Sequence, residues 1–196
     1  ITKSDAFKMT SFCSTSGPMF IIGAVGIGML KNATFGYIIF ISHILGALLN
    51  GLLYRNIKVK EEKIEYTEKT NTQNLSTMVI DSALSIITVG TIIAIFFVVI
   101  TSLSPIFNLF PPQISCVLEG IIEITKGCLD ISTNIHGAFS VVACTFVISF
   151  GGISTILQSI TMLNSLRMPI KLFILQKVTH ALFSTIISLL LVTIFL

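Results

Sequence analysis

The sequence predicts an all-α polytopic membrane protein with broken and re-entrant helices. Of its 196 residues, 53% are hydrophobic and only 11% are charged, whereas soluble domains contain about 25% charged residues. Nine of the 21 charged residues (12 basic plus 9 acidic) fall between Arg55 and Lys69. The apolar runs outside this stretch are long enough to cross a bilayer. One of them contains a Gly-Gly pair, which predicts a broken helix.

Three runs are predicted to be complete membrane spans: Phe35–Tyr54, Met78–Ile106 and Lys171–Leu196. Each contains 20 residues or more, and about 20 helical residues cross the hydrocarbon core. The hydrophilic stretch from Arg55 to Thr77 contains five of the Lys and Arg residues. By the positive-inside rule we expect this loop to be cytoplasmic.

Two further segments are too short to span the bilayer. Met19–Leu30 has 12 residues, about 18 Å of helix, so a re-entrant half-helix is predicted. Pro18 suits its first turn and Ser16 suits its N-cap. The second segment, Gln113–Thr133, is also short and more polar, and it follows a predicted turn at Asn108–Pro112 because two prolines cannot continue a helix.

The run Phe146–Leu163 is apolar but contains Gly151 and Gly152 side by side. Each glycine inside a helix costs about 1 kcal/mol relative to alanine. A membrane helix tolerates such a break where the freed backbone lines a cavity or packs against protein. The pair therefore indicates either a discontinuous helix at a solute site or a place where helices pack closely.

An internal repeat relates the two ends of the chain. Ser16–Pro18, followed by one half-helix, matches Phe150–Gly152, followed by another, at an offset of 134 residues. Ser42–Leu45 matches Thr179–Leu182 at an offset of 137 residues. The helix bearing His43 runs toward the basic loop and the helix bearing His180 runs away from it. We therefore predict an inverted repeat, as in many secondary transporters.

The two predicted breaks form a candidate solute site. Helix N-termini present unpaired N–H groups and a partial positive charge, which favour anions. A pocket between them would suit a solute that carries a carboxylate or forms hydrogen bonds. The candidate residues are Ser14, Ser16 and Gly17 at the first break, and Ser149, Gly151, Gly152, Ser154 and Gln158 at the second.

Acidic residues in the second short segment extend the candidate site. Glu119 and Glu123 are four residues apart and are predicted to share one helix face. Ionisable side chains inside a membrane mark function, and Glu123 is the stronger candidate. The alternative is a mutually paired strip with Lys126 and Asp130. We expect Thr125 and Gly127 to end this half-helix at the depth of the site.

No catalytic residue, metal site or cofactor is predicted. His43 and His180 are expected to be hydrogen-bonded core histidines, since no H-E-x-x-H motif accompanies them. The four cysteines lack C-x-x-C spacing, and we expect those in apolar surroundings to be small core residues. An enzyme is therefore not expected.

Four segments together resemble the YlbJ-type sporulation integral membrane proteins. They read SGPMFIIGAVGIGML, SHILGALLNGLLYR, LEGIIEITKG and ISFGGISTILQSI. That family belongs to the wider group with Gate or nucleoside-recognition domains, whose architecture is related to concentrative nucleoside transporters. The resemblance covers nearly the whole chain, which is expected to be the C-terminal half of the family's usual length.

The resemblance implies a role in endospore formation, in a membrane that surrounds the forespore, with transport of dipicolinic acid, a small aromatic dianion. Alternatives are a non-transporting scaffold of a sporulation complex, or a transporter of nucleosides or another metabolite. Expected partners are the lipid bilayer, a small-molecule solute and either a second copy or other sporulation membrane proteins, with no nucleic acid. The predicted division is the end of a first membrane repeat (1–55), a cytoplasmic loop (56–77) and a second Gate-like repeat (78–196).

Overall fold

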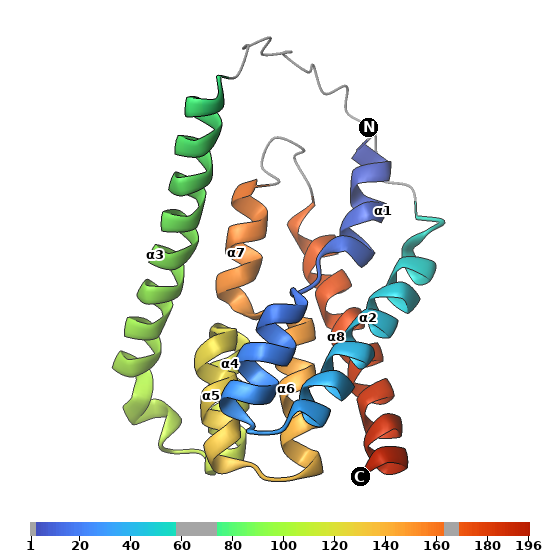
Figure 1. Cartoon of the computed structure of the whole chain (residues 1–196), viewed down its shortest axis with the longest axis vertical. Helices are drawn as coiled ribbons and strands as arrows, with labels where there is room; N and C mark the ends of the chain where they lie inside the picture. Colours follow the sequence, from blue (N-terminus) through green and yellow to red (C-terminus); the bar gives the residue numbers. More distant parts are fainter. Residues whose placement is uncertain (1–2, 58–73, 163–168) are drawn as a thin grey trace.

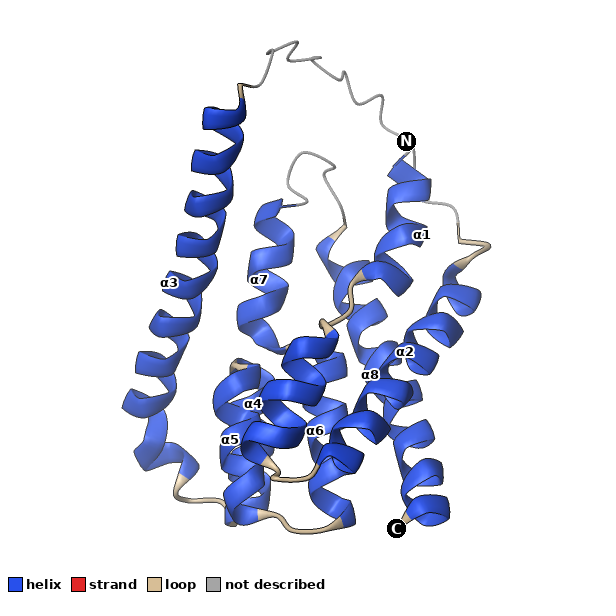
Figure 2. Cartoon of the chain, in the orientation of Figure 1, coloured by secondary structure: helices blue, strands red, loops and turns tan. Residues whose placement is uncertain are grey.

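The computed structural model describes residues 3–57, 74–162 and 169–196. Within these ranges every regular element is a helix (Figure 2). In chain order they are α1 (Lys3–Cys13), the π-helix η1 (Met19–Met29), α2 (Ala33–Tyr54), α3 (Leu75–Phe107), α4 (Pro112–Ile122), α5 (Ile124–Asn134), α6 (Ala138–Phe150), α7 (Gly152–Met162) and α8 (Ile170–Phe195). The predicted cytoplasmic loop lies largely outside the described residues.

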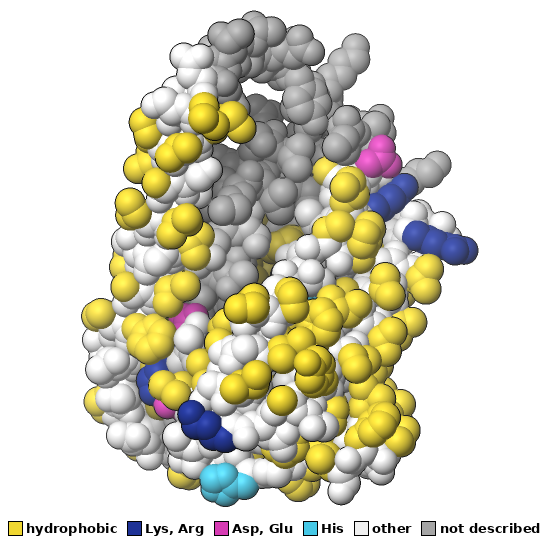
Figure 3. Space-filling model, in the orientation of Figure 1, with side chains coloured by type: hydrophobic (Ala, Val, Ile, Leu, Met, Phe, Trp, Pro, Cys, Tyr) yellow, Lys and Arg dark blue, Asp and Glu magenta, His cyan; other side chains and the backbone are white. Residues whose placement is uncertain are grey.

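Four helical stretches are long and apolar enough to cross a membrane. They are α2, α3, α8 and the combined stretch Ala138–Ile160 formed by α6 and α7. Large apolar side chains on their outer faces are exposed, such as Leu48, Ile87 and Leu190, and hydrophobic side chains cover much of the face in Figure 3. Such a surface suits contact with lipid tails. The predicted fold class, an all-α polytopic membrane protein, is confirmed, with three full spans and one broken span.

Two groups of helices run in opposite directions. In Figure 1 the chain passes down through α1 and η1 and returns upward along α2, whereas it passes up through α6 and α7 and returns downward along α8. Each group contains a helix break at mid-height. This arrangement agrees with the predicted antiparallel copies.

The two returning helices, α2 and α8, pack directly on each other at the centre. The rings of His43 and His180 lie 4.7 Å apart. One turn further along α2, a Cβ at Gly46 would lie 2.9 Å from Cα of Ser184, so glycine is needed for this close approach. A second small-residue contact joins Gly26 of η1 to Gly36 of α2, because small residues let the two backbones approach closely.

The first helix, α1, was not predicted, because its sequence is polar and rich in serine and threonine. Tertiary contacts stabilise it: Phe7 is fully buried and packs edge-on against Tyr54 with ring centroids 6.0 Å apart. The Asn50 side chain donates to the carbonyl of Ser11 (2.7 Å) and to that of Gln176 (3.2 Å). A buried polar network thus joins α1 to α2 and α8.

Helices α4 and α5 form a hairpin that enters and returns at the same end of the molecule (Figure 1). The predicted turn before it is confirmed, since α3 ends at Phe107 and α4 begins at Pro112. The hairpin packs beside α6, and Cys116, Cys128 and Cys144 are buried there. These three cysteines are core residues, as predicted.

Candidate functional site

The break between α6 and α7 depends on two glycines with left-handed backbone. Gly151 has φ +90° and its N–H donates to the carbonyl of Val147 (3.0 Å), which ends α6. Gly152 has φ +59° and begins α7. Only glycine adopts these conformations readily. In addition, a Cβ at Gly152 would lie 3.3 Å from the carbonyl oxygens of Gly120 and Ile122. The predicted break is therefore present, and it lies against the α4–α5 hairpin.

The segment between α1 and η1 forms a second break, but not with the predicted cap. Pro18 occupies the N-cap position in a right-handed helical conformation, and no side chain caps η1. The carbonyl of Gly17 instead accepts from the N–H groups of Phe20 (3.1 Å) and Ile21 (3.2 Å). The prediction that Ser16 caps this half-helix is wrong, because the helix begins at Met19 and Pro18, which has no side-chain acceptor, occupies the N-cap position.

His43 of α2 joins the two breaks. The backbone N–H of Ser16 donates to its Nε2 (3.0 Å), and its Nδ1 lies 2.8 Å from Oγ of Ser149. Because Nε2 accepts a hydrogen bond, the imidazole is neutral with its proton on Nδ1, which donates to Ser149. His180 Nε2 in turn lies 3.0 Å from the carbonyl oxygen of His43. Both histidines are hydrogen-bonded core residues, as predicted.

Lys177 of α8 also lies between the two breaks. Its ammonium Nζ donates to the carbonyl of Ser14 (2.8 Å). A Cβ at Gly151 would lie 3.6 Å from the same Nζ. Lys177 is only 5% exposed. This lysine was expected inside the last span but not in the site, although a cation well inside an apolar span is a usable signal. We call the region formed by Ser14, Ser16, His43, Ser149, Gly151, Gly152 and Lys177 the break junction.

A third chain break, at Glu123, meets the break junction through Gly152. Glu123 has extended backbone (φ −142°, ψ 124°), is 2% exposed, and accepts from the backbone N–H of Lys126 (2.8 Å) as the N-cap of α5. The prediction that Glu119 and Glu123 share a helix face is wrong, because α4 ends at Ile122, between the two residues. Glu123 is thus a buried carboxylate that holds the start of α5.

The prediction that Thr125 and Gly127 end a half-helix is wrong, since both belong to the first turns of α5. Thr125 is partly buried. Gly127 is buried, and a Cβ there would overlap Cα of Gly120 on α4. Gly127 therefore permits the two arms of the hairpin to touch, and the helix break lies at Glu123 because that residue leaves the helical conformation.

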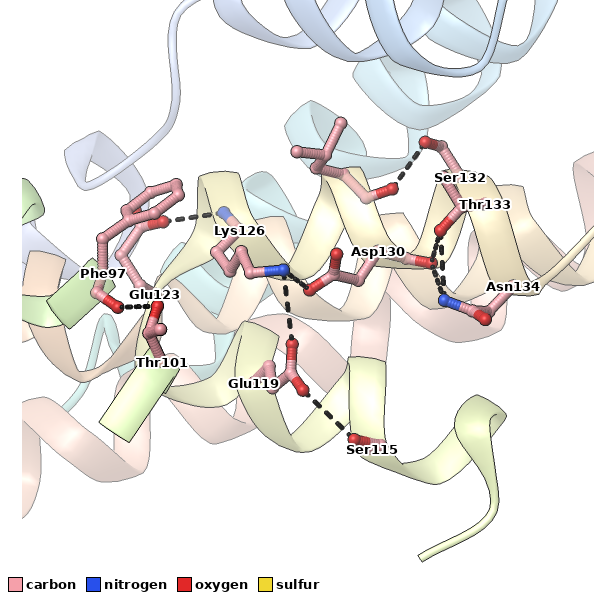
Figure 4. A network of polar contacts seen from close by, with 11 residues as sticks. Phe97, Thr101, Ser115, Glu119, Glu123, Lys126, Asp130, Ser132, Thr133 and Asn134 are labelled. Carbon is pink, nitrogen blue, oxygen red and sulfur yellow. Dashed lines mark hydrogen bonds and ion pairs between the residues drawn. The ribbon is translucent and has the colours of Figure 1, made fainter. Parts of the chain in front are cut away.

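Glu119, Lys126 and Asp130 form the paired strip that had been the alternative interpretation (Figure 4). Lys126 bonds Asp130 one turn along α5 and lies 3.9 Å from the Glu119 carboxylate across the hairpin. Ser115 donates to the other Glu119 oxygen (3.1 Å). These side chains line a pocket of about 410 Å³ beside the α3–α4 turn. Glu119 is therefore paired on the hairpin surface, while Glu123 lies in the interior.

Ser154 and Gln158 lie on α7, beyond the break. Ser154 is fully buried in the first turn, and its Oγ has no hydrogen-bond partner among the described residues. Gln158 is partly buried in the second turn. The structure thus brings together most of the predicted residues of both breaks, and Glu123 approaches them through its neighbours Ile122 and Ile124, which contact Gly152.

The chemistry of this arrangement is that of a preformed polar cluster inside apolar helices. The break junction supplies hydrogen-bond donors from Lys177 and from the start of α7, whose first N–H groups have no partner within the helix. Glu123 already accepts from the start of α5. The donors of Lys177 and of the start of α7 suit an anionic or hydrogen-bond-accepting group, while the carbonyl oxygens of Gly120 and Ile122 face Gly152 from the hairpin.

Comparisons with known proteins agree with a membrane location. No protein-family model and no solved structure matches the chain. The chain is 25% identical, over 231 aligned positions, to the sporulation integral membrane protein YlbJ of Bacillus subtilis (strain 168), and the alignment covers 97% of this chain. It covers 57% of that relative, so the chain spans a little over half the length of the protein it matches. The chain is therefore an integral membrane protein of helical construction that is similar to YlbJ.

Proposed function

We propose that this protein is a secondary transporter of a small anionic solute that acts in endospore formation, and that dipicolinic acid is the best candidate solute. The sporulation context comes from the similarity to YlbJ, whose name refers to sporulation. The choice of an anion comes from the donors of the break junction. Dipicolinate carries two carboxylates and would use such donors.

The observation that carries this proposal is the meeting of three chain breaks inside the helix bundle. The α1–η1 and α6–α7 breaks share His43 and Lys177, and the α4–α5 break packs against Gly152. Discontinuous helices with inward-facing ends form the solute sites of many transporters. A scaffold protein would have no need for buried, left-handed glycines and a buried lysine at such a junction.

The antiparallel arrangement of the two helix groups suggests the mechanism. In inverted-repeat transporters one bundle rocks against the other around a central site, which opens to each side of the membrane in turn. Here the group α1–η1–α2 and the group α6–α7–α8 meet at the break junction. We propose that relative motion of these groups exposes the junction alternately to the two sides.

The test is uptake of labelled dipicolinate into proteoliposomes that contain the purified protein. Glu123→Gln and Gly152→Leu should each abolish uptake, since one removes the buried negative charge at the start of α5 and the other places a large side chain in the junction. Matched controls are Asp81→Asn and Gly90→Leu on α3, because Asp81 is exposed and a Cβ at Gly90 meets open space. Uptake is compared at equal amounts of inserted, monodisperse protein.

Wild-type uptake that both site variants retain would contradict the location of the site. No uptake of dipicolinate by the wild type, together with uptake of uridine, would indicate a nucleoside transporter instead. No uptake of either solute by a well-inserted wild type would favour the scaffold alternative.

A further inference from the structure

Lys177 is a buried cation without a counter-charge in the described part of the protein. It lies seven residues after Ile170, where α8 begins, which places it about 11 Å along the helix. None of the ion pairs among the described residues includes Lys177, and its Nζ has one hydrogen bond, to the carbonyl of Ser14. An ammonium group has three donors. Besides its one hydrogen bond, the Lys177 Nζ lies 5.8 Å from the centroid of the Phe173 ring, and these two neutral contacts compensate a buried charge poorly.

The start of α7 lies beside this ammonium group and also has hydrogen-bond donors without acceptors. Gly151, where a Cβ would lie 3.6 Å from the Lys177 Nζ, immediately precedes α7. The first N–H groups of an α-helix have no partner within the helix and carry a partial positive charge. The Oγ of Ser154, in that first turn, is fully buried and has no hydrogen-bond partner in the described residues. A buried hydroxyl without a partner is an exception in proteins.

One type of group would suit each of these donors. A carboxylate has two oxygens and about four acceptor positions, and it forms strong hydrogen bonds with ammonium groups and with helix N-termini. A cation or a hydrogen-bond donor would instead meet Lys177 and the positive end of α7. The carboxylate of Glu123 already accepts from the N–H of Lys126 at the start of α5.

We propose that Lys177 determines the charge specificity of the break junction. It binds one carboxylate of a small solute between its Nζ and the first turn of α7, and Ser154 donates a hydrogen bond to the same group. This assignment rests on the proposed transport function, because the bound carboxylate belongs to the transported solute. Beyond the transport function, it names the residue that makes the site prefer an acid over a neutral molecule of the same shape.

The experiment measures binding to the purified protein by isothermal titration. The ligands are pyridine-2,6-dicarboxylate and its neutral isostere pyridine-2,6-dicarboxamide. The wild type should bind the dicarboxylate and prefer it strongly. Lys177→Met, which keeps most of the volume, should weaken dicarboxylate binding by about 10- to 100-fold and remove the preference over the diamide. Ser154→Ala should weaken binding by about 3- to 10-fold.

A matched control is Ser184→Ala. Ser184 is also fully buried, and its Oγ also has no hydrogen-bond partner in the described residues, but it lies under Gly46 between α2 and α8. This variant should bind the dicarboxylate as the wild type does. If Lys177→Met does not fold, the affinity of Ser154→Ala and the wild-type preference for the dicarboxylate over the diamide still test the proposed carboxylate position.

The outcomes separate the two proposals. A wild type that binds neither ligand would overturn the proposed transport of such an anion, and with it this assignment. A wild type that binds the dicarboxylate, with Lys177→Met or Ser154→Ala equal to it in affinity and in preference, would overturn the role of that residue alone. Equal wild-type binding of the diamide would overturn charge selection by Lys177.

Discussion

Gly152→Ala should destabilise the protein, because two separate effects act at this position. The backbone at Gly152 has φ +59°, and a left-handed conformation costs an L-residue about 1–2 kcal/mol. A Cβ would also lie 3.3 Å from the carbonyl oxygens of Gly120 and Ile122, so the hairpin must shift by a few tenths of an ångström. We expect a total loss of about 2 kcal/mol in the free energy of unfolding, and a melting temperature lower by about 4–8 °C.

The assay uses the buried thiols, because the chain contains no Trp. A fluorogenic thiol reagent reports unfolding through Cys116, Cys128 and Cys144, which are buried, once the exposed Cys13 is replaced by serine. The matched control is Gly17→Ala at the other break, where a Cβ meets nothing within 4 Å and φ is not positive. Its melting temperature should fall by less than about 2 °C. If the two alanine variants melt together, the structural role given to Gly152 is wrong.

Two further variants test the packing that positions the junction, with the same melting assay. Asn50→Ala removes the amide that donates to the carbonyls of Ser11 and Gln176. Because both carbonyls are left without this donor, we expect the free energy of unfolding to fall by about 1–3 kcal/mol. An unchanged melting temperature would refute the network. Gly46→Ala places a Cβ 2.9 Å from the backbone of α8, and this overpacking should lower the free energy of unfolding by about 1–3 kcal/mol. The control Gly90→Ala, whose Cβ meets open space, should not destabilise the protein. Equal effects of the two variants would show that α2 and α8 do not meet at Gly46.

The spans and breaks could be predicted because they depend on local signals. Long apolar runs need only length and composition, and adjacent glycines inside such a run indicate a break wherever they occur. Gly151 and Gly152 both have positive φ, which is the physical reason for the pair. The antiparallel order of the two helix groups also followed from the position of the basic loop relative to His43 and His180.

The contacts that assemble the site could not be predicted, because they join residues far apart in the sequence. Nothing local in α8 shows that Lys177 bonds the carbonyl of Ser14, 163 residues away. Likewise, the sequence around Glu123 reads as one helix face, and only the hairpin shows that this residue is an extended N-cap. Helix α1 was missed for the same reason, since packing rather than local pattern stabilises it.

The most direct test of the break junction as a solute site is the accessibility of position 154. Ser154→Cys, in a Cys13→Ser background, is treated with a membrane-impermeant methanethiosulfonate reagent in proteoliposomes, with and without saturating dipicolinate. Ser184→Cys is the control, because that site lies between α2 and α8 and should not react. We expect the thiol at position 154 to react as the junction opens, and dipicolinate to slow the reaction at least about tenfold. A thiol that never reacts, or one whose rate dipicolinate does not change, would contradict the assignment of the break junction as a solute site.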